Sequence, residues 1–225
     1  MGDKMEKKNW FEEKPIYNSD INNYFDNKLP INFNKIQNDF NIKISSCNFD
    51  IMKVDKKFQE VNTVENIAGM IFIKDGIINL YYSKSYETEE KRFIIANLIS
   101  YCMNMDETKE EAVIIDYDLM LKCDEAFDGM NKKELQECIN NKIARQILMP
   151  EDQFKLRYLM LLQSSCSEEV IITGLAALFM VPEREVIIRC KELEIDLDLE
   201  NELDNEINLE TNCGIMKKIG SKIKR

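Results

Sequence analysis

Residues 67–103 read IAGMIFIKDGIINLYYSKSYETEEKRFIIANLISYCM, and the period of the apolar residues changes halfway along this stretch. In the first half, apolar runs at residues 70–73 and 77–82 flank Lys74-Asp75-Gly76. An Asp-Gly pair between two apolar runs is a strong signal for a tight β-hairpin. The sequence therefore predicts a hairpin over residues 67–82.

The second half of the stretch has helical spacing. Thr88 is a suitable N-cap, and the two glutamates that follow it place negative charge at the positive end of the helix dipole. Apolar residues then recur every three or four positions, which predicts a helix from Thr88 to about Met103. Asn97 and Tyr101 are four residues apart, so we expect both on one face of this helix.

Shorter signals extend the pattern in both directions. Upstream, the spacing predicts two helices and a strand, at residues 15–29, 31–40 and 41–46. Downstream it predicts a series of helices, at residues 112–123, 131–149, 150–162, 167–179 and 182–193. Asn131 and Glu134 have the spacing of a capping box at the start of one of them. The predicted fold class is α+β and helix-dominated, with a small antiparallel sheet.

The composition excludes several kinds of function. The 225 residues contain no histidine, which excludes His-based triads, a His general base and metalloproteases with paired His ligands. Lys+Arg 30 against Asp+Glu 41 gives a net charge of −11. Because phosphate neutralisation needs a concentrated basic face, this balance argues against a nucleic-acid binder that uses its whole surface.

The cysteines and the N-terminus indicate a compartment. The seven cysteines stand singly, and no two have C-x-x-C spacing, which is typical of reduced thiols in a cytosolic protein. The N-terminal residues MGDKME are polar and lack the apolar region of a signal peptide. No apolar run approaches the roughly 18 residues of a membrane span. We therefore expect a cytoplasmic protein without a membrane anchor.

Several motifs follow one another in a fixed order. They are Leu-Pro-Ile at residues 29–31, a Gly-Met strand at 69–70, the hairpin, an Arg-Phe helix at 92–101 and a helix ending in Leu-Met-Pro at 148–150. This order resembles the ImmA/IrrE family, whose members are cytosolic zinc metallopeptidases that cleave helix-turn-helix repressors. The resemblance runs from about residue 16 to 195. It implies a zincin-like domain at residues 15–163 and helix-turn-helix-like closing helices at residues 164–195.

The resemblance also implies that the active site is degenerate. The family's first helix reads roughly R-F-T-x-A-H-E-x-x-H, in which both His bind zinc and the Glu takes a proton from metal-bound water. Residues 92–101 here read RFIIANLISY, so Asn97, Leu98 and Tyr101 stand at those three positions. The later family motif, approximately E-x-x-A-N-x-F-A-x-x-L-L-M-P, is similar to ECINNKIARQILMP and keeps the third ligand as Glu137. The resemblance thus implies no zinc and no hydrolysis by the family mechanism.

Three interpretations of the altered site stay open. Asn97, Tyr101 and Glu137 can form a hydrogen-bonded polar pocket, since an amide, a phenol and a carboxylate can satisfy one another. The same pocket can instead hold a small ligand or a partner's residue. The third is a metal site rebuilt with Cys102 or Cys138, although each of these points about 100° away from its neighbour along the helix.

The ends of the chain carry weaker signals. The second closing helix offers Arg184, Arg189 and Lys191 beside three glutamates, so the closing pair is either a packing module or a DNA reader. Residues 1–14 are charged, and we expect them to be flexible. Residues 196–225 form an acidic and then basic tail, which is a solvated segment, an intramolecular clasp or a partner-binding arm.

The leading functional hypothesis is a catalytically inactive pseudoprotease, not an enzyme, that acts as a regulatory protein of a bacterium, phage or mobile element. It is expected to bind a helix-turn-helix transcriptional regulator without cleaving it, and to need no cofactor. An extended partner segment can add to a sheet edge. We therefore expect contacts along the hairpin, at Met70, Phe72, Leu80 and Tyr82.

Two alternatives belong to other functional classes. One is an enzyme with altered, zinc-independent chemistry that uses Glu137, Tyr101 and a cysteine. The other is a DNA-associated regulator that acts through its closing helices. The net charge of −11 argues against direct nucleic-acid binding at physiological salt.

Overall fold

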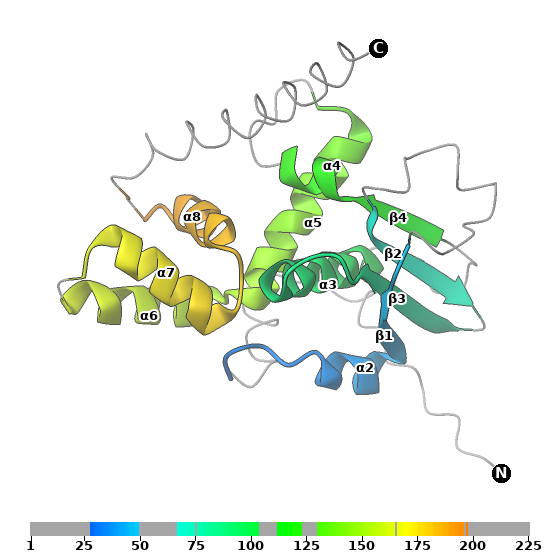
Figure 1. The fold of residues 1–225 in the computed structure, drawn as a ribbon, viewed down its shortest axis with the longest axis horizontal. Coiled ribbons are helices and arrows are strands. Elements are labelled where there is room, and N and C mark those ends of the chain that lie inside the picture. The colour runs from blue at the N-terminus through cyan, green and yellow to red at the C-terminus, as the bar shows by residue number, and fades with distance from the viewer. Residues whose placement is uncertain are drawn as a thin grey trace, which may run out of the picture.

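The computed structural model describes residues 28–49, 67–74, 76–103, 112–122, 130–164, 166–195 and 197. The predicted helix at residues 15–29 lies almost entirely outside this described part, as do the segment 1–14 and the tail beyond Leu197. In chain order the elements are α2 (Asn34–Phe40), β1 (Ile42–Cys47), β2 (Ile67–Lys74), β3 (Ile77–Ser83), α3 (Thr88–Cys102), β4 (Ala112–Asp116), α4 (Tyr117–Lys122), α5 (Lys132–Leu148), α6 (Glu151–Gln163), α7 (Glu168–Phe179) and α8 (Glu183–Glu192) (Figure 1).

The fold combines α and β structure, as predicted, and the β-hairpin is confirmed. Strands β2 and β3 are antiparallel, with Lys74 opposite Ile77 at the turn. Gly76 has a φ of 70°, a left-handed conformation that glycine adopts without the steric cost of a Cβ. The expected purely antiparallel sheet is wrong, because β1 pairs with β3 in parallel. Alternation along residues 41–46 identifies a strand, but it does not specify the partner or the direction.

A fourth strand replaces half of a predicted helix. The sequence pattern predicts a helix over residues 112–123, whereas residues 112–116 form β4 and only Tyr117–Lys122 is helical. Strand β4 pairs antiparallel with β2, placing Ile114 opposite Met70. The run Val-Ile-Ile has β-branched side chains that favour a strand once β2 offers a partner, so tertiary context decides here. Asp116 then accepts a hydrogen bond from the Leu119 amide at 3.2 Å and starts α4.

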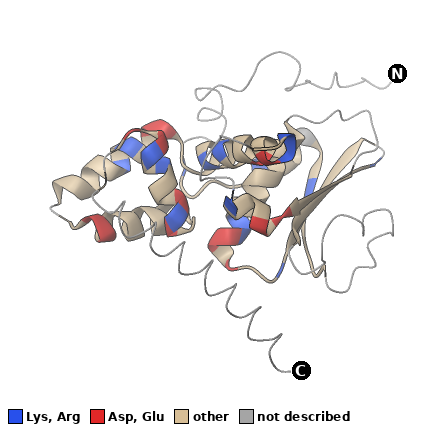
Figure 2. Cartoon of the chain, turned by 90° about the horizontal axis from the view of Figure 1, so that it is seen from above, with Lys and Arg blue, Asp and Glu red and all other residues tan. Residues whose placement is uncertain are grey.

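The sheet has the strand order β1-β3-β2-β4, and α3 lies along one of its faces. On its other side α3 packs against α5, so the sheet, α3 and α5 form successive layers (Figures 1 and 2). Every residue of α3 from Phe93 to Ser100 is buried, because the helix is covered on both sides. The layer between sheet and helix is apolar and contains Ile71, Leu80 and Leu98, none of which is exposed.

Helices α6, α7 and α8 pack together beside these layers. Helix α7 packs against both α6 and α8, and Figure 1 shows the three helices together at one end of the molecule. The Phe154 and Phe179 rings lie 5.7 Å apart between α6 and α7. The three helices lie at the positions predicted from the sequence, residues 150–162, 167–179 and 182–193, to within one residue at each end. No helix in the described part of the chain has the length and apolarity that crossing a membrane requires.

The predicted starts of α3, α5, α6, α7 and α8 hold to within one residue, whereas the helix predicted from residue 31 begins only at Asn34. Asn131 caps α5, and its side chain and that of Glu134 form the reciprocal pair of a capping box. The start of α3 is one residue earlier than predicted, because Glu87 and not Thr88 is the N-cap. There the Glu90 carboxylate accepts a hydrogen bond from the Glu87 amide at 2.9 Å.

Candidate functional site

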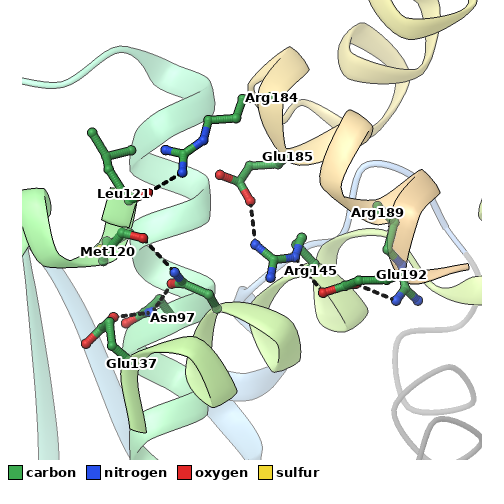
Figure 3. A network of polar contacts seen from close by, with 10 residues as sticks. Asn97, Met120, Leu121, Glu137, Arg145, Arg184, Glu185, Arg189 and Glu192 are labelled. Atoms are coloured by element: carbon green, nitrogen blue, oxygen red, sulfur yellow. Dashed lines mark hydrogen bonds and ion pairs between the residues drawn. The ribbon is translucent and has the colours of Figure 1, made fainter. Parts of the chain in front are cut away.

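A buried polar seam joins α3 to α5, and it contains the three residues that sequence reasoning placed together. The Asn97 Nδ2 atom donates to Glu137 Oε1 at 2.8 Å, and the Tyr101 hydroxyl donates to Glu137 Oε2 at 2.5 Å. Asn97 and Tyr101 lie one turn apart on α3, and Glu137 lies in the first half of α5. The expected juxtaposition of these side chains is therefore confirmed. Figure 3 shows Asn97 and Glu137 directed toward each other between the two helices.

The seam is longer than sequence reasoning predicted. Asn97 Nδ2 also donates to Asn141 Oδ1 at 2.8 Å, and Asn141 Nδ2 donates to the Met120 carbonyl on α4 at 2.8 Å. One turn away, the Ser100 hydroxyl donates to Asn140 Oδ1 at 3.0 Å. Asn141 stands four residues after Glu137, which is the one sequence signal that places it on the same face. The seam thus ties α3, α5 and α4 to one another.

The carboxyl group of Glu137 is unusual because it is only 1% exposed and no cation contacts it among the described residues. Burial raises the pKa of this carboxyl above its ordinary value, because water no longer solvates the charged form. The hydrogen bonds from Tyr101 and Asn97, together with the positive charge of Lys133, lower the pKa in part, while Asp116 raises it. The net direction is upward, so protonation of Glu137 is easier here than in water.

Two amide atoms in the seam are left without a hydrogen-bond partner in the described structure. They are Asn97 Oδ1 and Asn140 Nδ2, and both are buried. A buried polar atom without a partner loses its solvation without compensation. The polar seam is therefore incompletely satisfied, although its central carboxylate has two donors.

Leu98 lies on a different side of α3 from the polar seam. Its side chain is fully buried and points to β2, where Gly69 leaves room for it. A Cβ at Gly69 would lie 2.9 Å from Leu98 Cδ1 and 3.0 Å from the Tyr81 carbonyl oxygen. The position that the family resemblance assigns to the proton acceptor is therefore occupied by a core side chain that cannot take a proton.

The residues of the seam do not fit a zinc ion. The amide of Asn97 and the phenol of Tyr101 both use their hydrogen atoms to donate to Glu137, and neither group resembles the imidazole or thiolate ligands of zinc sites. Cys138 is buried with Sγ 3.5 Å from Met130 Sδ, and Cys102 is buried in the apolar core. Within the described ranges, no three His, Cys, Asp or Glu residues come together as a metal site.

The structure corrects the expectation that a partner strand adds to the edge of the hairpin. Both hairpin strands are internal, since β1 covers β3 and β4 covers β2. The edges of the described sheet are β1 and β4. Pairing with β4 was missed because residues 112–116 were expected to be helical.

The four hairpin residues expected at the partner contact separate onto two faces. Leu80 is fully buried, and Tyr82 packs partly buried against the core. Phe72 is 38% exposed and Met70 is half-buried on the opposite face, which none of the described helices covers. Met70 and Phe72 therefore lie on the face away from the core, whereas Leu80 and Tyr82 lie on the face toward it.

The second closing helix uses its arginines inside the molecule. Arg189 is 2% exposed, donates to the Met149 carbonyl at 3.1 Å and pairs with Glu192 at 3.0 Å. Arg184 donates to the Leu121 carbonyl. Arg145 of α5 completes the network with ion pairs to Glu185 at 3.0 Å and Glu192 at 2.9 Å (Figure 3). Arg189 is buried and Arg184 is half-buried, so Lys191 is the one exposed residue among the three cations expected to read DNA. A recognition helix reads DNA with several exposed side chains, which disfavours this role for α8.

A pair of tyrosines anchors the start of α4 to α3. The rings of Tyr86 and Tyr117 have centroids 4.3 Å apart, and the Tyr117 hydroxyl donates to Glu90 Oε1 at 2.6 Å. Burial and the nearby Glu90 charge raise the pKa of Tyr86 to about 12. Sequence reasoning missed this contact because β4, which brings Tyr117 to α3, was not predicted.

No protein-family model matches the chain, and no curated protein matches its sequence.

Proposed function

We propose that this protein is a catalytically inactive relative of the ImmA/IrrE metallopeptidases that regulates by binding a helix-turn-helix transcriptional regulator. The observation that supports the proposal is the convergence of Asn97 and Tyr101 on the Glu137 carboxylate. These three positions correspond to the three zinc ligands in the family motifs. Their side chains meet within hydrogen-bonding distance although none of the contacts is needed to form either helix.

The chemistry of the seam supports a binding role over catalysis. An altered enzyme would need a reactive group that a substrate can reach, whereas Glu137 is 1% exposed and Asn97 is not exposed. Leu98 removes the proton acceptor of the family mechanism and contributes to the core instead. A DNA-reading role is disfavoured by the internal pairing of Arg184 and Arg189.

Strand β4 is the edge at which we propose that the partner binds. It is an edge strand of the described sheet, and α4, which follows it directly, accepts the Asn141 hydrogen bond of the seam. An extended segment that pairs with β4 would gain main-chain hydrogen bonds and would lie next to Ile114, with β4 between the segment and Met70 and Phe72 of β2. The proposed contact therefore moves from the hairpin to the edge next to it.

Charge would assist the encounter. The chain carries a net charge of −11, and regulators that bind DNA present basic faces. Attraction of this kind accelerates association and is screened by salt. Binding should therefore weaken as ionic strength rises.

The experiment is titration of the full-length chain with helix-turn-helix regulators encoded near its gene, by calorimetry at low and moderate salt. Two substitutions on the same row of the sheet provide the contrast, because Ile114 and Ser45 stand at its two edges. Ile114→Lys should weaken binding by about tenfold or more, which corresponds to about 1.4 kcal/mol, whereas Ser45→Lys should leave it unchanged. Failure of every regulator to bind, or equal effects of the two substitutions, would contradict the proposal.

A further inference from the structure

Strand β1 is the second edge of the described sheet, and the direction of its backbone groups follows from its pairing with β3. The carbonyl of Cys47, at the end of β1, accepts a hydrogen bond from the Lys84 amide at 2.9 Å. Because backbone groups alternate in direction along a strand, the amides of the even-numbered residues point away from the sheet. These outward amides belong to Ile42, Ile44 and Ser46. An edge strand with free outward groups is a template on which a strand of another molecule can pair.

Helix α2 is folded back beside this edge. Asn41 ends the helix in the left-handed conformation, with a φ of 53°, and β1 begins at the next residue. The Asn41 side chain donates to the Gly76 carbonyl at 3.2 Å, which holds the connection on the hairpin turn. Ile36 of α2 is 4% exposed and belongs to the apolar core. Figure 1 shows α2 next to β1, at the opposite end of the sheet from β4.

One side chain of α2 binds the middle outward amide of β1. The Gln37 Oε1 atom accepts a hydrogen bond from the Ile44 amide at 3.1 Å. The Gln37 Nε2 atom donates to Asn34 Oδ1 at 3.2 Å, which keeps the amide oxygen directed toward β1. Since the Ile44 amide already has an acceptor, a strand that pairs along β1 would have to displace Gln37.

We infer that α2 guards the β1 edge, with Gln37 preventing Ile44 from pairing with a strand of another molecule, including β1 of a second copy. Covering an edge strand is one of the ways in which proteins prevent edge-to-edge aggregation. In the described part of the chain no side chain bonds to the backbone of β4, the other edge. The guard therefore directs an added strand to β4, the edge at which the regulator of the proposed function would bind.

The first test is amide hydrogen exchange of the full-length chain, followed residue by residue by NMR. Gln37→Leu removes the acceptor of the Ile44 amide, whereas the matched control Gln37→Glu keeps an acceptor at the same place. Exchange at Ile44 should become about tenfold faster in Gln37→Leu, the order expected for the loss of one hydrogen bond, and should change little in Gln37→Glu. Equal exchange at Ile44 in the wild type and Gln37→Leu would overturn the inference.

The second test releases α2 and measures association by sedimentation. Ile36→Asp combined with Gln37→Leu removes both the core anchor and the cap, so this variant should form larger species than the wild type, whose chain mass is 26.5 kDa. Adding Ser46→Pro should reverse the association, because proline removes an outward amide without breaking the ladder to β3.

An α2-released variant that associates no more than the wild type would overturn the inference, as would association that Ser46→Pro leaves unchanged. Circular dichroism checks folding, and if the released variant does not fold, the exchange at Ile44 in the two single variants decides. Neither test requires the regulator, so failure here is distinguishable from failure of the proposed function.

Discussion

The hydroxyl of Tyr101 lies 2.5 Å from the carboxylate of Glu137, across the contact between α3 and α5. This short hydrogen bond connects α3, which packs on the sheet, to α5, which packs on the other side of α3. Because Glu137 is buried away from water, its carboxylate is stabilised by the hydrogen-bond donors that surround it and not by solvent. Substitutions in the pair therefore report directly on how the polar seam is held.

Tyr101→Phe should destabilise the protein by about 1.5–3 kcal/mol, because it removes one of two donors to a buried carboxylate. Tyr117→Phe is the matched control, since it removes a hydroxyl that donates at 2.6 Å to Glu90, a carboxylate that is only half-buried. Water can replace the lost donor at Glu90, so this control should cost less. Urea denaturation of both variants gives the two free energies of unfolding, and a larger loss for Tyr117→Phe would contradict the assignment of the seam.

Glu137→Gln should change the dependence of stability on pH. Burial holds the folded pKa of Glu137 above its ordinary value of 4.5, so the folded state of the wild type prefers the protonated carboxyl. As pH rises from 4.5 through the raised pKa, the wild type loses stability that the neutral glutamine cannot lose. The free energy of unfolding of the variant should therefore increase relative to the wild type across this window and then level off. Denaturant titrations at several pH values measure the difference, and a decrease with pH would refute the direction of the shift.

The ion network between α5 and α8 should be far more sensitive than a surface pair. Arg145 contacts both Glu185 and Glu192, and its side chain is 4% exposed. Arg145→Met removes the buried cation that contacts Glu185 and one of the two cations that contact Glu192, for which we expect a loss of about 3–5 kcal/mol. Lys155→Met is the control, because Lys155 pairs with Glu151 at 47% exposure and such pairs contribute less than about 1 kcal/mol. Similar losses in thermal unfolding of the two variants would show that the network is not buried in solution.

Local patterns predicted those parts of the fold that are encoded within a single segment. The hairpin follows from an Asp-Gly pair and two apolar runs, and the start of α5 follows from Asn131 and Glu134. The parallel pairing of β1 with β3 depends on residues about 36 apart, such as Ile42 and Ile78, and no local pattern records that choice. The sequence pattern did not predict strand β4 for the same reason, because Val113 and Ile114 form a strand only when β2 is present to pair with them.

The candidate site was predictable to the extent that helical spacing and the family motifs fix it. Asn97 and Tyr101 were expected on one face, and the motif placed Glu137 opposite them. Asn141 lay within the quoted motif, but its role depends on the Met120 carbonyl of α4, a helix whose position depends on β4. The error in β4 thus concealed both the rest of the seam and the true edge of the sheet.

The last prediction tests whether the seam descends from a zinc site. The Asn97 Nδ2 atom and the Tyr101 hydroxyl each lie within 2.8 Å of a different oxygen of Glu137, so side chains at both positions reach the same carboxylate. Asn97→His combined with Tyr101→His would supply two imidazoles at i and i+4 beside that carboxylate, which is the donor set of a three-ligand zinc site. The double variant should bind one zinc per chain, measured by atomic absorption after dialysis, and should gain thermal stability when zinc is added.

Two further variants are the controls for zinc binding. Adding Glu137→Ala to the double variant should remove most of that binding. Asn97→His with Tyr117→His, which places the second imidazole elsewhere, should bind no stoichiometric zinc. A correctly folded double variant that fails to bind zinc would contradict the proposed relationship to the metallopeptidases, whatever partner the protein binds.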